Sequence, residues 1–179
     1  SPCVFYHMDK NLRVVVHGDD FTILGYEGSL DWFKERITDK YEIKFRGRLG
    51  PNPKDDKEIR LLNRVIYWDK EGIKYEPDQR HAEIMIKLAG VEGKKSVATP
   101  GSKPADTKDE EEDDVPLEGD AVTRFRAITA RGNYLSQDRL DIKYAIKELC
   151  RRMAQPRRRD WRKLIRLTKY LIGRQRFIC

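Results

Sequence analysis

The sequence predicts an α+β fold, with antiparallel β-hairpins and helices followed by an all-helical basic region. Before residue 77, short runs of β-branched and aromatic residues alternate with turn residues, which is typical of antiparallel strands. From residue 80 onward, apolar residues recur at helical spacing. With 39% hydrophobic and 37% charged residues, the composition indicates a folded chain with a lean core. It contains no apolar run of about 18 residues, so we expect no membrane span.

The first three strands are expected at Val4–His7, Leu12–His17 and Phe21–Gly25, where β-favouring residues predominate. Gly18 permits a tight bend between the second and third of these runs. The two runs therefore predict a hairpin.

A helix is expected over residues 30–40, because apolar residues follow Ser29 at helical spacing and a serine is a favourable N-cap. Tyr41–Phe45 alternates apolar and polar residues and predicts another strand. Ile59–Trp68 and Ile73–Tyr75 predict a second hairpin, whose turn ends at a glycine in the left-handed conformation.

The rest of the chain predicts four helices and a linker. Pro77 is expected at the start of a helix that ends near Gly90. Residues 93–119 are expected to form a linker, because prolines and an acidic run are typical of a solvated tether. The acidic run could also repel nucleic acid or dock on the basic region. Apolar stripes then mark three helices: Phe125, Ile128 and Leu135; Ile142, Ala145, Ile146, Leu149 and Met153; Trp161, Leu164, Ile165, Thr168, Leu171 and Ile172.

Asp19 and Asp20 lie between two strand-like runs and are therefore expected at the tip of the first hairpin. Paired carboxylates on a rigid turn supply the hard oxygen ligands that Mg²⁺ takes in phosphoryl-transfer sites. Aspartates are also common in solvated turns, because they tolerate unusual backbone angles, and this alternative stays open. His17 is interpreted as a neighbour of the site and not as a catalytic residue, because a histidine in such a strand usually fills space or bonds a backbone carbonyl.

The charge of the chain is strongly asymmetric. Residues 1–120 carry 20 basic and 26 acidic side chains, whereas residues 121–179 carry 17 basic and 4 acidic ones. Such a basic helical region favours a polyanion partner, although a solvated helix face is the alternative. The candidate nucleic-acid-binding residues are Arg157, Arg158, Arg159, Arg162, Lys163, Arg166 and Lys169, with Arg174 and Arg176 nearby.

The three cysteines and three histidines show no spacing that is typical of a zinc site or a disulfide framework. This favours a reducing, intracellular compartment.

Taken in order, the motifs resemble the reverse transcriptase region of Ty1/copia-type retrotransposon Pol polyproteins. The segment Val16-His17-Gly18-Asp19-Asp20, with Ile23-Leu24-Gly25 after it, is similar to the L-Y-V-D-D block and the downstream I-x-G. Asp138-Arg139-Leu140-Asp141-Ile142 is similar to T-R-P-D-I, and Trp161 with Tyr170-Leu171-Ile172-Gly173 is similar to W…Y-L-x-G. The chain departs from the family at His17 and Gly18, which replace Tyr and Val, and at Leu140, where Pro is usual.

The resemblance implies a partial polymerase palm with a thumb-like segment over residues 1–92, an acidic flexible linker over 93–119 and a basic helical connection over 120–179. In the family, the first acid of the pair and an upstream acid hold two metal ions. Asp19 would then be the main metal ligand, with Asp20 beside it, for Mg²⁺ or Mn²⁺. The upstream acid lies on a strand outside this sequence, so the isolated chain is expected not to polymerise.

The implied partners are an RNA template, a DNA primer, a dNTP, the upstream fingers and palm, and the downstream ribonuclease H. The implied location is a cytoplasmic virus-like particle or the nucleus, with no membrane partner. Two alternatives stay open at this point. They are a nonenzymatic nucleic-acid-binding module and a metal-dependent phosphohydrolase.

Overall fold

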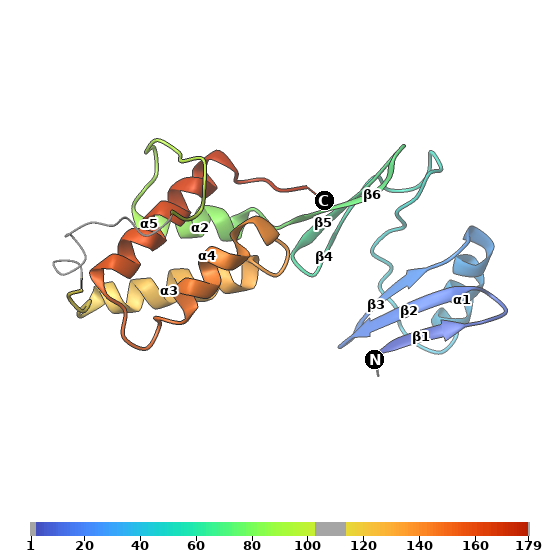
Figure 1. Ribbon diagram of the computed structural model, residues 1–179. Helices are drawn as coiled ribbons and strands as arrows, with labels where there is room; N and C mark the ends of the chain where they lie inside the picture. The colour runs from blue at the N-terminus through green and yellow to red at the C-terminus, as the bar shows by residue number, and fades with distance from the viewer. Residues whose placement is uncertain (1–2, 103–113, 179) are drawn as a thin grey trace. The chain divides into compact units, whose positions relative to one another are not determined.

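The computed structural model describes residues 3–102 and 114–178 and has an α+β fold (Figure 1). Within these ranges, two three-stranded antiparallel sheets precede a mostly helical region of four helices. The chain divides into two compact units, residues 1–46 and residues 47–179. Each unit has its own sheet.

The first unit contains β1 (Val4–His7), β2 (Leu12–His17), β3 (Asp20–Leu24) and α1 (Glu27–Thr38). The strands are antiparallel in the order β1-β2-β3, which confirms the expected strands to within a residue. Leu12 and Val14 of β2 are buried and the intervening Arg13 is exposed, as the two-residue period of a strand requires.

Helix α1 packs on the sheet face that carries Leu12 and Val14. The register places His7 opposite Leu12, and the Trp32 ring of α1 meets the His7 ring edge-on at 5.2 Å. The opposite face of the sheet has no such cover among the described residues of this unit. Its apolar side chains include Val15, 45% exposed, and Leu24, 57% exposed.

Two expectations in this unit are wrong. Helix α1 begins at Glu27 with Tyr26 as its N-cap residue, so Ser29 lies in the first turn. Tyr41–Phe45 does not form a strand, although its residues alternate. A strand needs a neighbour for its backbone hydrogen bonds, and the described residues place none beside this segment. Phe45 packs instead under the Lys34 ammonium, 4.2 Å from its ring centre.

The sheet of the second unit contains β4 (Glu58–Leu61), β5 (Arg64–Asp69) and β6 (Gly72–Pro77), in that order. The expected hairpin whose turn ends at Gly72 is confirmed by the pairing of β5 with β6. Gly72 has a φ of 131°. The single expected strand Ile59–Trp68 is divided by a turn at Leu62 and Asn63, whose φ angles are 47° and 60°. A type I′ turn requires two such angles, and leucine rarely supplies one.

The helices of the second unit are α2 (Arg80–Ala89), α3 (Asp120–Leu135), α4 (Leu140–Cys150) and α5 (Arg158–Gly173). The expected helix start at Pro77 is wrong, because this proline ends β6. The expected end at Gly90 is confirmed by its left-handed backbone. The buried core comprises Ala82, Met85, Ile86, Ala89, Val91, Phe125, Ile128, Leu135, Ile142, Ile146, Leu149, Leu164, Leu167, Tyr170 and Leu171.

This core joins all four helices, since α2 packs on α3 and α5, and α4 packs on both of these helices. The division at residues 92 and 119 stays a prediction, and most of the acidic run lies outside the described residues. Across 3–102 and 114–178, no helix combines the length and the apolar character that crossing a bilayer requires.

Candidate metal and nucleic-acid sites

The β2–β3 hairpin holds the aspartate pair at its tip, as expected. His17 pairs with Asp20 in the ladder, so Gly18 and Asp19 form a two-residue loop. Gly18 has a φ of 63°, which a tight hairpin loop needs at this position and which glycine adopts without steric cost. The Asp19 side chain is exposed at the turn, and Asp20 begins β3 with a side chain that is 31% exposed.

Asp20 lies on the sheet face opposite α1. The two-residue period places Asp20 on the same face as its partner His17 and as Val15, whereas Val14 faces α1. The hairpin therefore presents the Asp20 carboxylate on the side that no helix of this unit covers. His17 is exposed beside it, which leaves its expected space-filling role without support.

The Asp20 carboxylate already has a cationic partner. Arg46 Nη2 lies 3.1 Å from Asp20 Oδ1, and the Arg46 side chain is 66% exposed. An ion pair this exposed contributes only about 0–1 kcal/mol, so a metal ion can compete for the carboxylate. Sequence reasoning did not identify Arg46, because 26 residues separate it from Asp20.

The two carboxylates fit part of a magnesium coordination shell. Mg²⁺ is often held by one or two carboxylates, with waters and substrate phosphates as the remaining ligands. Among the residues that the structure describes, no group of three or more Asp, Glu, His or Cys side chains gathers in metal-binding geometry. The Asp19 and Asp20 carboxylates could therefore supply two of the ligands of a metal ion, and its remaining ligands would have to come from elsewhere.

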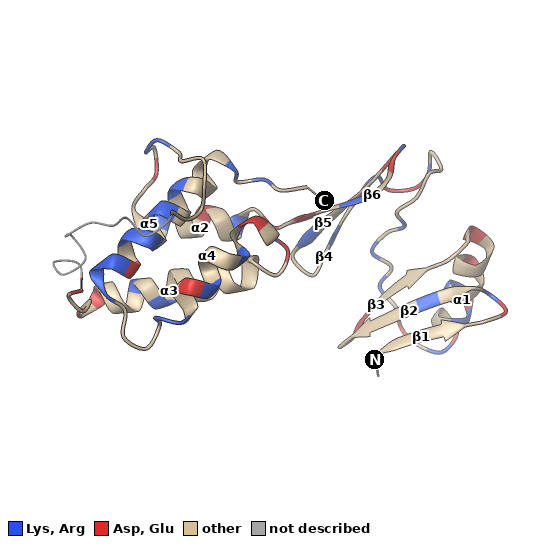
Figure 2. Ribbon diagram, in the orientation of Figure 1, with Lys and Arg blue, Asp and Glu red and all other residues tan. Residues whose placement is uncertain are grey.

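The basic residues of the C-terminal region line α5 (Figure 2). The apolar stripe of this helix is confirmed, with Leu164, Thr168 and Leu171 buried. Arg158, Arg162 and Lys163 are exposed, and Arg166 and Lys169 are half-buried. Residues spaced three and four apart share a helix face, so this set forms one basic surface along the helix.

Two of the candidate nucleic-acid-binding residues, Arg157 and Arg159, and the nearby Arg176 pair with acidic side chains. Arg157, the N-cap residue of α5, and Arg159 both pair with Asp114. Arg176 binds the buried carboxylate of Glu76, with its Nε 3.0 Å from Oε1 and its Nη2 2.8 Å from Oε2. The hydrogen bonds from Arg176 are the main reason why the pKa of Glu76 is lowered, in spite of its burial.

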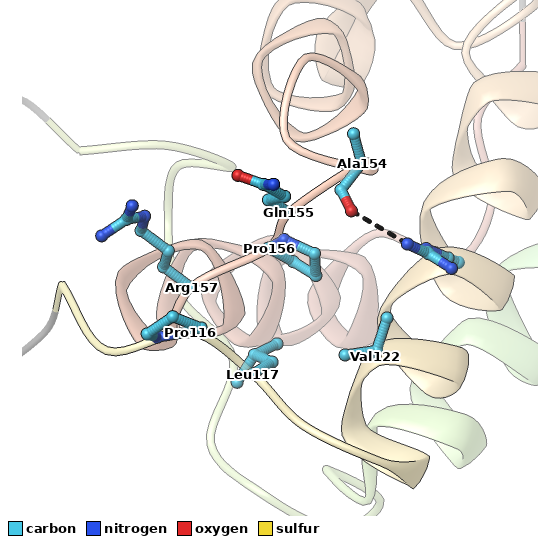
Figure 3. A pocket seen from close by; sticks show the side chains of 8 residues that line it. Pro116, Leu117, Val122, Ala154, Gln155, Pro156 and Arg157 are labelled. Atoms are coloured by element: carbon cyan, nitrogen blue, oxygen red, sulfur yellow. Dashed lines mark hydrogen bonds between the residues drawn. The ribbon is translucent and has the colours of Figure 1, made fainter.

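A shallow cavity of about 350 Å³ lies where the chain enters α5 (Figure 3). Leu117, Val122 and Pro156 supply apolar walls, and the Arg126 guanidinium donates to the carbonyl oxygens of Met153 and Ala154. Arg126 belongs to α3, so these hydrogen bonds connect α3 to the turn between α4 and α5. The residues that line the cavity include no carboxylate, histidine or cysteine.

Comparisons of this chain with protein-family models, with curated proteins and with solved structures find no match.

Proposed function

We propose that this chain is the C-terminal part of a copia-type reverse transcriptase, in which Asp19 and Asp20 hold catalytic Mg²⁺. The observation that carries the proposal is the β2–β3 hairpin, which places the two acids at its tip and Asp20 on the face opposite α1. A polymerase palm needs this arrangement, because the metal ions must meet the primer and the nucleotide on an open sheet face.

In this proposal Asp19 is the main metal ligand and Asp20 supports it after release from Arg46. Mg²⁺ held by Asp19 and Asp20 would supply activation of the primer 3′-hydroxyl and charge stabilisation of the leaving pyrophosphate. The third acid comes from another segment of the intact protein. The exposed apolar side chains Val15 and Leu24 support such an additional layer, because contiguous exposed apolar surface usually marks an interaction site.

The first experiment measures metal binding by this chain. Mn²⁺ added to isotope-labelled protein should broaden the amide resonances of residues 17–21, and Asp19→Asn should abolish the broadening. Asp39→Asn serves as the matched control, because it removes the same charge from an exposed residue beyond α1. Equal broadening in wild type and Asp19→Asn would contradict the proposed metal site.

The second experiment measures primer extension in the intact polyprotein. Loss of a metal ligand removes several kcal/mol of transition-state stabilisation, so Asp19→Asn should lower the rate by about a thousandfold. The isolated chain should not extend a primer at all. Primer extension by the isolated chain, or unchanged extension by the intact variant, refutes the assignment.

A second candidate function is a nonenzymatic nucleic-acid-binding module. The observation that favours it is the basic surface of α5, on which Arg158, Arg162 and Lys163 are exposed. Replacing these three residues with alanine should weaken binding to a DNA duplex similarly across sequences. The slope of log K against log salt should become shallower by roughly three, one for each lost phosphate contact.

The phosphohydrolase alternative has less support. Such an enzyme needs further acids or histidines that converge on the hairpin, and the described residues provide no such group.

A further inference from the structure

The geometry points to Asp114 as an internal competitor of nucleic acid, because its carboxylate occupies a phosphate site formed by Arg157 and Arg159 at the start of α5. This inference rests on the second candidate function and assigns a regulatory role to one contact within that surface.

Backbone pairing fixes the position of Asp114. The Val115 carbonyl accepts a hydrogen bond from the Arg158 amide at 2.9 Å, and the Leu117 amide donates to the Pro156 carbonyl at 2.8 Å. Pro116 and Arg157 form an isolated antiparallel bridge between these two bonds. The chain segment that precedes α3 is thus held against the entry to α5.

Two guanidinium groups meet at the Asp114 carboxylate. Arg157 Nη1 donates to Oδ2 and also to the Asp114 carbonyl oxygen, the latter at 2.7 Å. Arg159 Nη1 lies 2.8 Å from Oδ1, but this oxygen has no aligned hydrogen bond. Two guanidiniums around one anion are an arrangement that also suits a phosphate group.

The three side chains of this contact are each partly exposed, and ion pairs with this much exposure typically contribute little to stability. The side chains of Asp114, Arg157 and Arg159 are 40%, 33% and 35% exposed, so solvent reaches part of each side chain, whereas the Asp114 Oδ1 atom itself is buried. Arg159 is followed at helical spacing by Arg162, Lys163 and Arg166, so the site is continuous with the basic surface of α5.

The segment after α2 also lies on this basic surface. The Thr99 hydroxyl accepts a hydrogen bond from Arg166 Nη2 at 2.9 Å. Ser96 lies so close to Gly173 that a Cβ added to this glycine would come within 3.0 Å of the serine Cβ. Neighbouring chain segments therefore cover parts of α5 at both ends. Asp114 pairs with the two arginines at the start of this helix, Arg157 and Arg159.

The test compares Asp114→Asn with Glu148→Gln in the full chain. Each variant removes one negative charge that pairs with arginine, but Glu148 pairs with Arg151 at the end of α4. Binding to a fluorescein-labelled 20-base-pair DNA duplex is followed by anisotropy between 50 and 300 mM NaCl. At the lowest salt, Asp114→Asn should bind about three- to tenfold more tightly than wild type, and Glu148→Gln less than about twofold.

Two freed arginines should also steepen the slope of log K against log salt by roughly two. Adding Arg157→Ala and Arg159→Ala to the Asp114→Asn variant should remove the gain in affinity. Equal affinities of Asp114→Asn and Glu148→Gln overturn the inference, and if Arg158→Ala still weakens binding, the α5 interface itself stands. Failure of both wild type and Asp114→Asn to bind the duplex overturns the interface together with the inference.

Discussion

The buried Arg139 side chain should contribute strongly to the stability of the second unit. It is 1% exposed, and its Nε and Nη2 donate to the two oxygens of Asp141 at 2.9 and 2.7 Å. Its Nη1 donates to the carbonyl oxygen of Arg174 at 2.9 Å, and the Tyr170 hydroxyl completes the network by donating to Asp141. The guanidinium thus joins the start of α4 to the end of α5.

We predict that Arg139→Met lowers the free energy of unfolding by about 3–5 kcal/mol. The variant keeps the apolar stem but leaves the Asp141 carboxylate and the Arg174 carbonyl without their donor, and removing one partner of a buried pair costs this much. Arg151→Met is the matched control. Its side chain is 61% exposed and pairs with Glu148, so the expected loss is less than about 1 kcal/mol.

The assay is urea denaturation followed by circular dichroism at pH 7 and pH 2, because the stabilisation is lost only below about pH 3.9, the usual pKa of an aspartate in an unfolded chain. Burial opposes the ionisation of Asp141, but the hydrogen bonds and charge of Arg139 outweigh this effect and lower its pKa. The stabilisation is present above the pKa of the unfolded chain and is lost as the pH falls through the lowered pKa. The difference between wild type and Arg139→Met should shrink towards acid, and a loss below about 1 kcal/mol at pH 7 would refute the reasoning.

Three further substitutions test other parts of the fold. Gly132→Ala should destabilise the protein by about 1–3 kcal/mol in urea denaturation, because its Cβ would lie 2.2 Å from Ile146 Cδ1 in the packed core. Burial and the charge of Arg131 lower the pKa of His81. Wild type should therefore lose stability as the pH falls from 7.5 to 5.5, and His81→Gln should lose less over this range. Leu62→Asn should raise the thermal midpoint and increase the free energy of unfolding by about 0.5–1 kcal/mol. The reason is that asparagine tolerates the left-handed backbone at this turn better than leucine does. An unchanged or lower thermal midpoint would contradict the view that Leu62 strains this turn.

The elements that sequence reasoning predicted correctly are those that depend on neighbours in the chain. The β2–β3 hairpin follows from two β-favouring runs around Gly18, and α2 follows from four apolar residues at helical spacing before Gly90. The strand expected at Tyr41–Phe45 fails because alternation does not supply a partner strand. The turn at Leu62 and Asn63 was missed because leucine is a poor residue for its backbone angles.

Of the candidate sites, the sequence predicted the positions of residues within one helix or hairpin, but not their contacts with other elements. The positions of Asp19 and Asp20 at a hairpin tip follow from local sequence, whereas the pairing of Asp20 with Arg46 depends on the fold. The same holds for Arg157, whose partner Asp114 is 43 residues away, and for Arg176, whose partner Glu76 is 100 residues away. Ion pairs of this separation leave no periodicity in the sequence.

The two units differ in how well their apolar residues are buried, and this difference bears on the proposed function. In the second unit, fifteen buried apolar residues form one core that joins four helices. Among the described residues of the first unit, Leu12 and Val14 are the buried apolar ones. A further packing partner would bury more apolar surface and so stabilise a sheet with so small a core. The face opposite α1 is the surface available for that partner within this unit, and it is also the face that carries Asp20. In the proposed function, an element packed on this face would lie beside Asp20 and would supply the third acid.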